Sequence, residues 1–289
     1  RPNLEMVDLI ENDEHFILIA LFFTVCMQLS FFAVAYMLRF DKVTDLAGTS
    51  NFIVLALLTL WLGGDLSFPK ILATLMVVLW SIRLAWYLFY RILIWGEDKR
   101  FDEIRKGFRS FLGFWILQIL WVFLLSLPVT YFNSLEDNLE LEVVSLAYVG
   151  LGAFFVGFGI EAWADYTKFN HKRNGEKWCE TGLWKYSRHP NYFGNILLWT
   201  GIFLFCYSGG VPLWTMMGLL WITFLLLFVS GINLLESSAD RKYGDDLEYH
   251  RYKSGTSVLI PMPSLLYTKI PESIQKTLLL DFNLYNNLK

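Results

Sequence analysis

Charged residues and cysteines are both scarce in this chain. Asp, Glu, Lys and Arg make up 18% of its 289 residues, against roughly 25% in soluble globular domains. Only three cysteines are present, Cys26, Cys179 and Cys206, and this odd number without CxxC spacing argues against both a disulfide framework and a zinc site. The net charge is -3 and there is no basic arm, which argues against nucleic-acid binding.

The sequence motifs of common soluble enzymes are also missing. The sequence has no Walker A loop, HExxH, nucleophile elbow, or GxGxxG placed after a strand. Gly150, Gly152, Gly157 and Gly159 instead fall inside an apolar segment, where small residues allow helices to pack closely. A nucleotide bound by this chain would therefore have to be held by a helical fold.

Apolar residues are abundant: 55% of the chain is hydrophobic, 18% is aromatic, and the mean hydropathy is +0.42. These values are typical of a membrane protein, in which about 20 apolar residues form one spanning helix. The longest run, 190–235, must fold back on itself, and the turn residues at 208–212 (SGGVP) divide it in two. We predict an all-α, multi-pass bundle of about seven transmembrane helices, near residues 16–39, 47–64, 70–94, 111–132, 143–165, 191–207 and 212–235.

Loop charges predict the orientation of the chain. Segments 96–109 and 168–188 hold five and six Lys or Arg, whereas segment 133–142 holds four acids and no base. The positive-inside rule places the two basic loops on one side of the bilayer and the acidic loop on the other. We predict a single membrane domain over 1–263 and a C-terminal tail over 264–289 that lies on the membrane surface. The expected location is the endoplasmic reticulum for a eukaryotic chain, with the mitochondrial inner membrane as the alternative.

A polar motif, GLWKYSRHPNYFG, occupies residues 182–194, where a basic loop meets an apolar run. Pro190 suits the first turn of a helix, so Arg188 and His189 flank a helix N-terminus. Free N–H groups and the helix dipole, together with Arg188, favour an anion such as phosphate. Asn195 shares a helix side with Asn191 and Tyr192. Headgroup anchoring by the basic and aromatic side chains is the alternative interpretation.

Two further polar clusters belong to the same predicted face. Glu161 and Asp165 are four residues apart at the inner end of the fifth span, and Lys172 and Arg173 follow them; a solvated, self-paired helix end is the alternative. Glu236 ends the last span, and a charged segment that includes His250 and Tyr252 follows, which a tail in water would also explain. These clusters together predict a ligand site on one membrane face.

Asp45 and Arg83 are charged residues near or within apolar segments. An unpaired cation inside a membrane costs about 2.5–3.5 kcal/mol on insertion scales, so Arg83 needs a partner or water. Asp45 is one candidate partner, and Glu97 and Asp98 are the others. A purely structural ion pair explains these residues as well as a catalytic one does.

At these residues the chain resembles the steroid 5-alpha-reductase superfamily, and within it a branch of multi-pass proteins of unknown function. The matching stretches extend over about residues 41–263 and read KVTDLAG (42–48), WGEDKRFDEIR (95–105), LQILWVFLLSLPV (117–129), EAWADYTK (161–168), GLWKYSRHPNYFG (182–194), VSGINLLE (229–236) and YKSGTSVLIP (252–261). Isoprenylcysteine and phospholipid methyltransferases carry a turn similar to RHPNYFG, so that motif alone is less specific.

The resemblance implies a seven-span fold that binds NADPH on its cytoplasmic side and transfers hydride to the beta carbon of an enone. Asp45 lies roughly where steroid reductases place a substrate-side glutamate, and Trp80 stands about where they place a tyrosine. Asn195 stands where an acidic residue commonly follows the RHPNYFG turn. The implied cofactor-site residues are Asp165, Arg173, Arg188, His189, Asn191, Tyr192, Asn195, Glu236, His250 and Tyr252.

The expected function is therefore NADPH-dependent reduction of a conjugated double bond in a lipid-like or sterol-like substrate, with Asp45 as the catalytic residue and no metal. Two alternatives stay open. One is a membrane methyltransferase that uses S-adenosylmethionine. The other is a catalytically silent subunit of a larger membrane complex, which the departures at Trp80 and Asn195 keep open.

Overall fold

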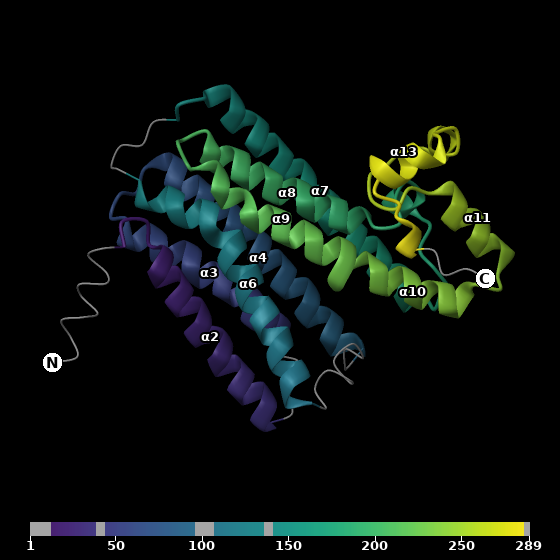
Figure 1. The fold of residues 1–289 in the computed structure, drawn as a ribbon, viewed down its shortest axis with the longest axis horizontal. Coiled ribbons are helices and arrows are strands. Elements are labelled where there is room, and N and C mark those ends of the chain that lie inside the picture. Colours follow the sequence, from purple (N-terminus) through teal and green to yellow (C-terminus); the bar gives the residue numbers. More distant parts are fainter. Residues whose placement is uncertain (1–12, 39–43, 96–106, 136–140, 286–289) are drawn as a thin grey trace. The chain divides into compact units, whose positions relative to one another are not determined.

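The computed structural model describes residues 13–38, 44–95, 107–135 and 141–285. Within these residues the regular elements are helices, and the one β interaction is an isolated bridge between Ser187 and Ser257. The predicted all-α class is confirmed (Figure 1).

Each of the seven predicted spans corresponds to helical structure. The first six are α2 (Ile17–Leu38), α3 (Thr44–Leu62), α4 (Phe68–Trp95), α6 (Phe108–Ser134), α7 (Val144–Arg173) and α8 (Pro190–Tyr207). The last is a composite of η3 (Leu213–Met216), α9 (Met217–Phe224), the π-helical turn η4 (Leu225–Val229) and α10 (Ile232–Tyr243). The remaining elements are η2 (Gly182–Lys185), α11 (Leu247–Gly255), α12 (Ser264–Tyr267), α13 (Glu272–Thr277) and η5 (Asn283–Tyr285).

Five of these segments are long and apolar enough to cross a membrane, by length and composition: Ile17–Met37, Phe68–Trp95, Phe108–Ser134, Val144–Arg173 and Leu213–Tyr243. The α3 helix contributes a shorter apolar stretch, Leu46–Leu62. The α8 helix has 18 residues, and its first turns carry Asn191 and Asn195. The chain is a multi-pass membrane protein, and that α3 and α8 also cross the membrane stays a prediction.

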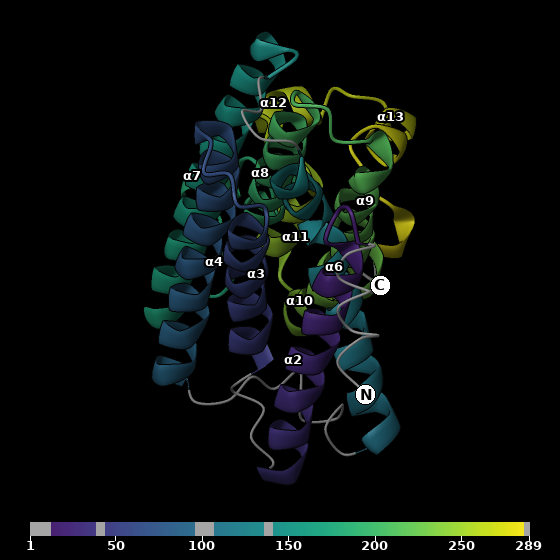
Figure 2. The same cartoon turned by 90° about the vertical axis from the view of Figure 1, so that its left-hand side faces the viewer.

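The described chain divides into two compact units. The first contains residues up to 152 together with 200–221, and the second contains 153–199 and 222 onward. In the first unit α2, α3, α4 and α6 lie side by side (Figures 1 and 2). Residues 264–285, here called the C-terminal segment, belong to the second unit, and the predicted domain boundary at 263 stays a prediction.

Polar side chains inside the first unit form hydrogen bonds to neighbouring helices. The amide of Gln28 donates to Asn51 Oδ1 at 3.0 Å, and the amide of Gln118 donates to the Thr44 carbonyl at 2.9 Å. Asn133 Nδ2 donates to Thr59 Oγ1 at 3.0 Å. Such bonds connect neighbouring helices where no water is available to satisfy the same groups.

Glycines allow α7 and α8 to approach closely. A Cβ atom on Gly157 would lie 2.5 Å from the Leu198 nitrogen, and one on Gly194 would lie 2.6 Å from the Glu161 nitrogen. The prediction of close packing is therefore confirmed at Gly157, and at Gly150, whose Cβ would lie 2.7 Å from the Phe205 nitrogen. It is wrong at Gly152 and Gly159, where a Cβ would meet no atom within 4 Å, because these two residues do not face α8.

Parts of the predicted loops lie outside the described residues. Those parts are residues 96–106 of the basic segment, with Glu97 and Asp98, and residues 136–140 of the acidic one. The orientation derived from loop charges stays a prediction. Arg83 is half-buried in α4 and lies over the Tyr87 ring, 5.9 Å from its centroid.

Candidate functional site

The backbone of the RHP turn is attached to a stretch about 70 residues further along the chain. The Arg188 amide donates to the Ser257 carbonyl at 2.8 Å, and the Met262 amide donates to the Tyr186 carbonyl at 3.0 Å. Ser187 is fully buried; its hydroxyl donates to the Leu259 carbonyl and accepts from the His189 amide. Arg188 and His189 are thereby fixed immediately before α8 begins at Pro190.

A buried charged cluster surrounds Arg188. Its guanidinium Nη1 donates to the Lys253 carbonyl at 3.2 Å and lies 3.5 Å from Glu236 Oε2. Its Nη2 lies 3.1 Å from Asp281 Oδ1. His189 Nε2 is 2.8 Å from Glu236 Oε1, and Lys253 Nζ is 3.2 Å from Glu236 Oε2. Glu236 therefore links α10 to both the RHP turn and α11.

Asp240 and Lys253 form the second half of this cluster. The Lys253 ammonium lies 2.6 and 2.7 Å from the two carboxylate oxygens of Asp240 and donates to the Tyr285 carbonyl at 2.7 Å. The Tyr249 hydroxyl donates to Asp240 Oδ1 at 2.8 Å. Charges this deeply buried persist only when they are paired and hydrogen-bonded. The Arg188 cluster, as named from here on, comprises Arg188, His189, Glu236, Asp240, Lys253 and Asp281.

Burial and neighbouring charges set the protonation of Arg188 and His189. Burial alone would lower the pKa of Arg188, but the Glu236 and Asp281 carboxylates raise it above its usual range. Burial lowers the pKa of His189 below its ordinary value, against an opposing contribution from its hydrogen bond to Glu236. Arg188 is thus a permanent cation, and His189 is neutral at pH 7.

The neutral His189 ring has one nitrogen that can accept a further hydrogen bond. Because the Glu236 carboxylate only accepts, Nε2 carries the proton, and Nδ1 is left as an acceptor. Nδ1 is buried and has no hydrogen-bond partner among the described residues. The ring stacks on Tyr192 with centroids 5.5 Å apart and planes 7° from parallel. Arg188 Nε is similarly buried without a partner.

A second set of polar side chains lies between α7 and α8. Asn191 Nδ2 donates to Asp165 Oδ1 at 3.2 Å, and Asn195 Nδ2 donates to Glu161 Oε1, also at 3.2 Å. The Oδ1 atom of Asn191 is buried and has no partner in the described part of the chain. The two acids are four residues apart on α7, and the two asparagines are four apart on α8. Each pair therefore shares one helix face, and the two faces meet.

Comparison with known proteins shows to which family the chain belongs. A profile described as "Protein of unknown function (DUF1295)" matches residues 31–256, which is more than half of the chain. The chain belongs to this family. It is also 28% identical over 198 residues to an uncharacterized protein of Schizosaccharomyces pombe, an alignment that spans 57% of this chain and 56% of the yeast protein. No solved structure matches the chain significantly.

The DUF1295 match contains every member of the Arg188 cluster except Asp281. Arg188, His189, Glu236, Asp240 and Lys253 all lie within residues 31–256. Asp281 lies beyond that range, as do Tyr267 and Tyr285. The C-terminal segment therefore adds a carboxylate to a set of charges that the family match already contains.

Three of the predicted cofactor residues lie outside the Arg188 cluster. Arg173 is exposed at the C-terminal end of α7. His250 Nε2 lies 2.6 Å from the Gly244 carbonyl, and the Tyr252 hydroxyl donates to the Trp184 carbonyl at 2.9 Å. Burial raises the pKa of Tyr252, so its hydroxyl stays protonated. Tyr252 is thereby bonded to η2, outside the Arg188 cluster.

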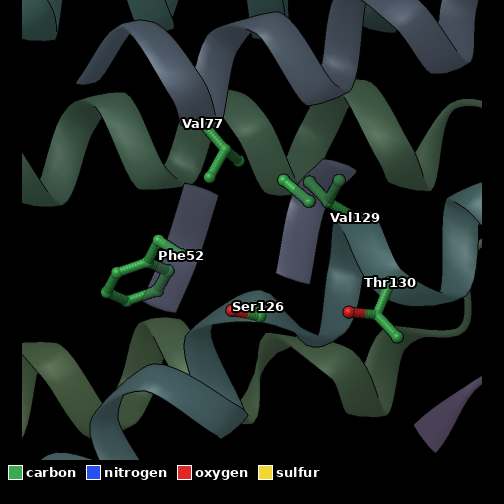
Figure 3. A pocket seen from close by; sticks show the side chains of 6 residues that line it. Phe52, Val77, Ser126, Val129 and Thr130 are labelled. Atoms are coloured by element: carbon green, nitrogen blue, oxygen red, sulfur yellow. The ribbon is translucent and has the colours of Figure 1, made fainter. Parts of the chain in front are cut away.

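The predicted catalytic residue, Asp45, belongs to the first unit, in the first turn of α3. Its side chain lies outside what the structure describes. Trp80 is buried against Phe52, with ring centroids 5.3 Å apart. Phe52, Ala56, Val77, Ser126, Val129 and Thr130 of this unit surround a gap that is too small to hold a water molecule (Figure 3).

Sequence reasoning missed half of the Arg188 cluster. Asp240 follows Glu236 by four residues, so a helix-face argument could have found it. Lys253 lies within the quoted stretch 252–261, but nothing local distinguishes its buried amine from a solvated one. Asp281 carries no local signal either, because its contact with Arg188 joins positions 93 residues apart.

Proposed function

We propose that this chain is an NADPH-dependent membrane reductase of a conjugated double bond in a lipid-like or sterol-like substrate. The observation that carries the proposal is the buried Arg188 cluster at the start of α8. A cation next to a helix N-terminus favours phosphate. The resemblance to steroid 5-alpha-reductases supplies the dinucleotide as the phosphate compound. For a eukaryotic chain we propose the endoplasmic reticulum membrane as its location.

The unsatisfied atoms of the second unit fit a polar ligand. Arg188 Nε can donate one more hydrogen bond, and His189 Nδ1 and Asn191 Oδ1 can each accept one. Buried polar atoms without partners are costly, and a bound molecule with amide and hydroxyl groups would satisfy them. We assign phosphate binding to Arg188 and contacts with the remaining polar groups to Asp165, Asn191 and Glu236.

NADPH supplies hydride to the beta carbon of an enone when bound. In the proposed reaction a proton reaches the alpha carbon, so that the double bond becomes a single bond. Asp45 is the proposed group that orients the enone or protonates it. The apolar substrate would enter from the lipid between spans, since the chain lies in a bilayer.

The proposal is tested by titrating purified protein in detergent micelles with NADPH and, separately, with S-adenosylmethionine. We expect NADPH to bind and S-adenosylmethionine not to, and Arg188→Gln to weaken NADPH binding at least about tenfold, a loss of about 1.4 kcal/mol. Arg241→Gln is the matched control, because Arg241 is exposed on α10 of the same unit. Absence of NADPH binding at millimolar concentration, by the wild type and by Asp281→Asn alike, would contradict the proposal.

A catalytically silent structural subunit is the second candidate. The observation that favours it is that both Nη atoms of Arg188 are already satisfied within the chain. This candidate predicts stable partner proteins that co-purify with the chain while neither NADPH nor S-adenosylmethionine binds.

A further inference from the structure

The Arg188 cluster is closed on one side by the C-terminal segment (residues 264–285). Asp281 Oδ1 lies 3.1 Å from Arg188 Nη2, and the Tyr267 hydroxyl donates to the other Asp281 oxygen. Four residues later, the Tyr285 carbonyl accepts from Lys253 and the Tyr285 hydroxyl donates to the Leu227 carbonyl at 3.0 Å. The segment thus places one carboxylate and one carbonyl on the two cations of the cluster.

The closed cluster holds more carboxylates than cations, which disfavours a further anion. Two cations, Arg188 and Lys253, face three carboxylates, those of Glu236, Asp240 and Asp281, while His189 is neutral. A phosphate brought to Arg188 would meet a net negative site at low effective dielectric, where like charges repel strongly. Without Asp281 the same groups balance, and the outer Nη atom of Arg188 is free to bind an oxyanion.

Asp281 contacts Arg188 at Nη2, the atom that an anionic ligand would also contact. Its carboxylate lies against Nη2, whereas Glu236 and the Lys253 carbonyl lie against Nη1. Glu236 and Lys253 belong to the part of the chain that matches the DUF1295 family, and Asp281 does not. Glu236 and the Lys253 carbonyl therefore hold the arginine in place, and Asp281 can leave without removing that support.

The segment next to Asp281 is short of regular structure and strained. The α12 and α13 helices have four and six residues. Leu280, immediately before Asp281, has a φ of 59°, in the left-handed region that non-glycine residues rarely adopt. Asp281 itself is about one-fifth exposed, in contrast to Arg188. Release of this segment would relieve the strain and expose Arg188 to solvent.

We propose that the C-terminal segment is an internal competitor of the anionic ligand of this site, in which the Asp281 carboxylate occupies the phosphate position on Arg188. This inference rests on the proposed function only for the identity of the ligand as NADPH. The site is closed while Asp281 binds Arg188, and an anion of sufficient affinity displaces the segment. The protein regulates access to its own cofactor site by this exchange.

The test compares wild type with Asp281→Asn, which keeps the size of the side chain and removes its charge. The probes are inorganic pyrophosphate and NADPH, each titrated by calorimetry into full-length protein in detergent micelles. We expect Asp281→Asn to bind both about tenfold more tightly than wild type. Glu272→Gln is the matched control: it removes an acid from the same segment that pairs with Lys276, on an exposed face, and we expect wild-type affinities.

Hydrogen exchange of residues 264–285 provides a second measurement. We expect pyrophosphate to accelerate amide exchange there in wild type, because the segment leaves when the anion binds. Equal pyrophosphate affinity in wild type and Asp281→Asn, including no binding to either, would overturn the inference whatever NADPH does. Tighter pyrophosphate binding by Asp281→Asn without any NADPH binding would instead support the inference and contradict the reductase.

Discussion

Arg188 carries a charge that is sealed inside the second unit, with 6% of its surface exposed. An ion taken out of water pays several kcal/mol even after the protein relaxes, so the charge must be balanced where it lies. Glu236 supplies that balance while Asp240 pairs with Lys253, and Asp281 adds a further carboxylate. Loss of one partner from such a pair costs about 3–5 kcal/mol, whereas an exposed pair is worth about 0–1 kcal/mol. The cluster therefore matters for stability as well as for the proposed binding.

His189 is expected to make the stability of the folded protein depend on pH. Its pKa is lowered in the folded protein, so the unfolded chain takes up a proton near pH 6.5 that the folded chain does not. Stability is then fully present above about pH 6.5 and is lost as pH falls toward the folded pKa. We expect the melting temperature of the wild type to fall between pH 7.5 and 5.5, and that of His189→Gln to fall less.

The control for this prediction is His250→Gln. It removes another imidazole of the second unit, which lies outside the Arg188 cluster and is bonded to the Gly244 carbonyl. Differential scanning fluorimetry in detergent measures all three proteins. An equal drop for His189→Gln and wild type would show that His189 is not the group that titrates.

Sequence reasoning reached the local residues of the site and missed the distant ones. It named Arg188, His189 and Glu236 because a turn, a proline and the end of an apolar span mark them in the sequence. It also named Arg173, which the structure leaves exposed, because a basic residue near a span end has the same local pattern whether or not it binds. Asp281 was missed because only the folded chain brings it to Arg188.

At the scale of elements, α7 and α8 hold the polar pairs of the site at a spacing that glycine sets. Gly194 ends the RHPNYFG motif, and a Cβ there would lie 2.6 Å from the Glu161 nitrogen on α7. The contact is with backbone, which cannot rotate away. The spacing supports the hydrogen bonds from Asn191 to Asp165 and from Asn195 to Glu161.

Gly194→Ala tests that spacing. We expect it to lower the free energy of unfolding by about 1–3 kcal/mol, the usual cost of overpacking a tight contact, and to weaken NADPH binding. Gly159→Ala is the matched control on α7, where a Cβ meets no atom within 4 Å and alanine favours the helix. Chemical denaturation in micelles measures both variants. Equal stability of the two would mean that Gly194 does not set the helix spacing.

The spans were predictable from apolar runs, but their ends were not. The α7 helix continues to Arg173, eight residues past the predicted end, and α10 continues to Tyr243 through a charged sequence. Hydropathy shows which residues lie in lipid. A helix can extend beyond those residues for as long as its backbone hydrogen bonds continue. The π-helical turn η4 was not predictable either; it leaves the Leu227 carbonyl bonded to the Tyr285 hydroxyl, a contact with a distant part of the chain.

At the scale of the whole molecule, the proposed reductase uses both units. The groups assigned to the cofactor lie in the second unit, and Asp45 lies in the first. The α7 and α8 helices each have residues in both units.

The most direct test of the central claim is a cryo-electron microscopy map of the full chain prepared with millimolar NADPH. We predict dinucleotide density in the second unit, with a phosphate within hydrogen-bond distance of Arg188 and Asp281 displaced from it. A map that resolves Arg188 still bound to Asp281, with no dinucleotide beside the start of α8, would contradict the claim.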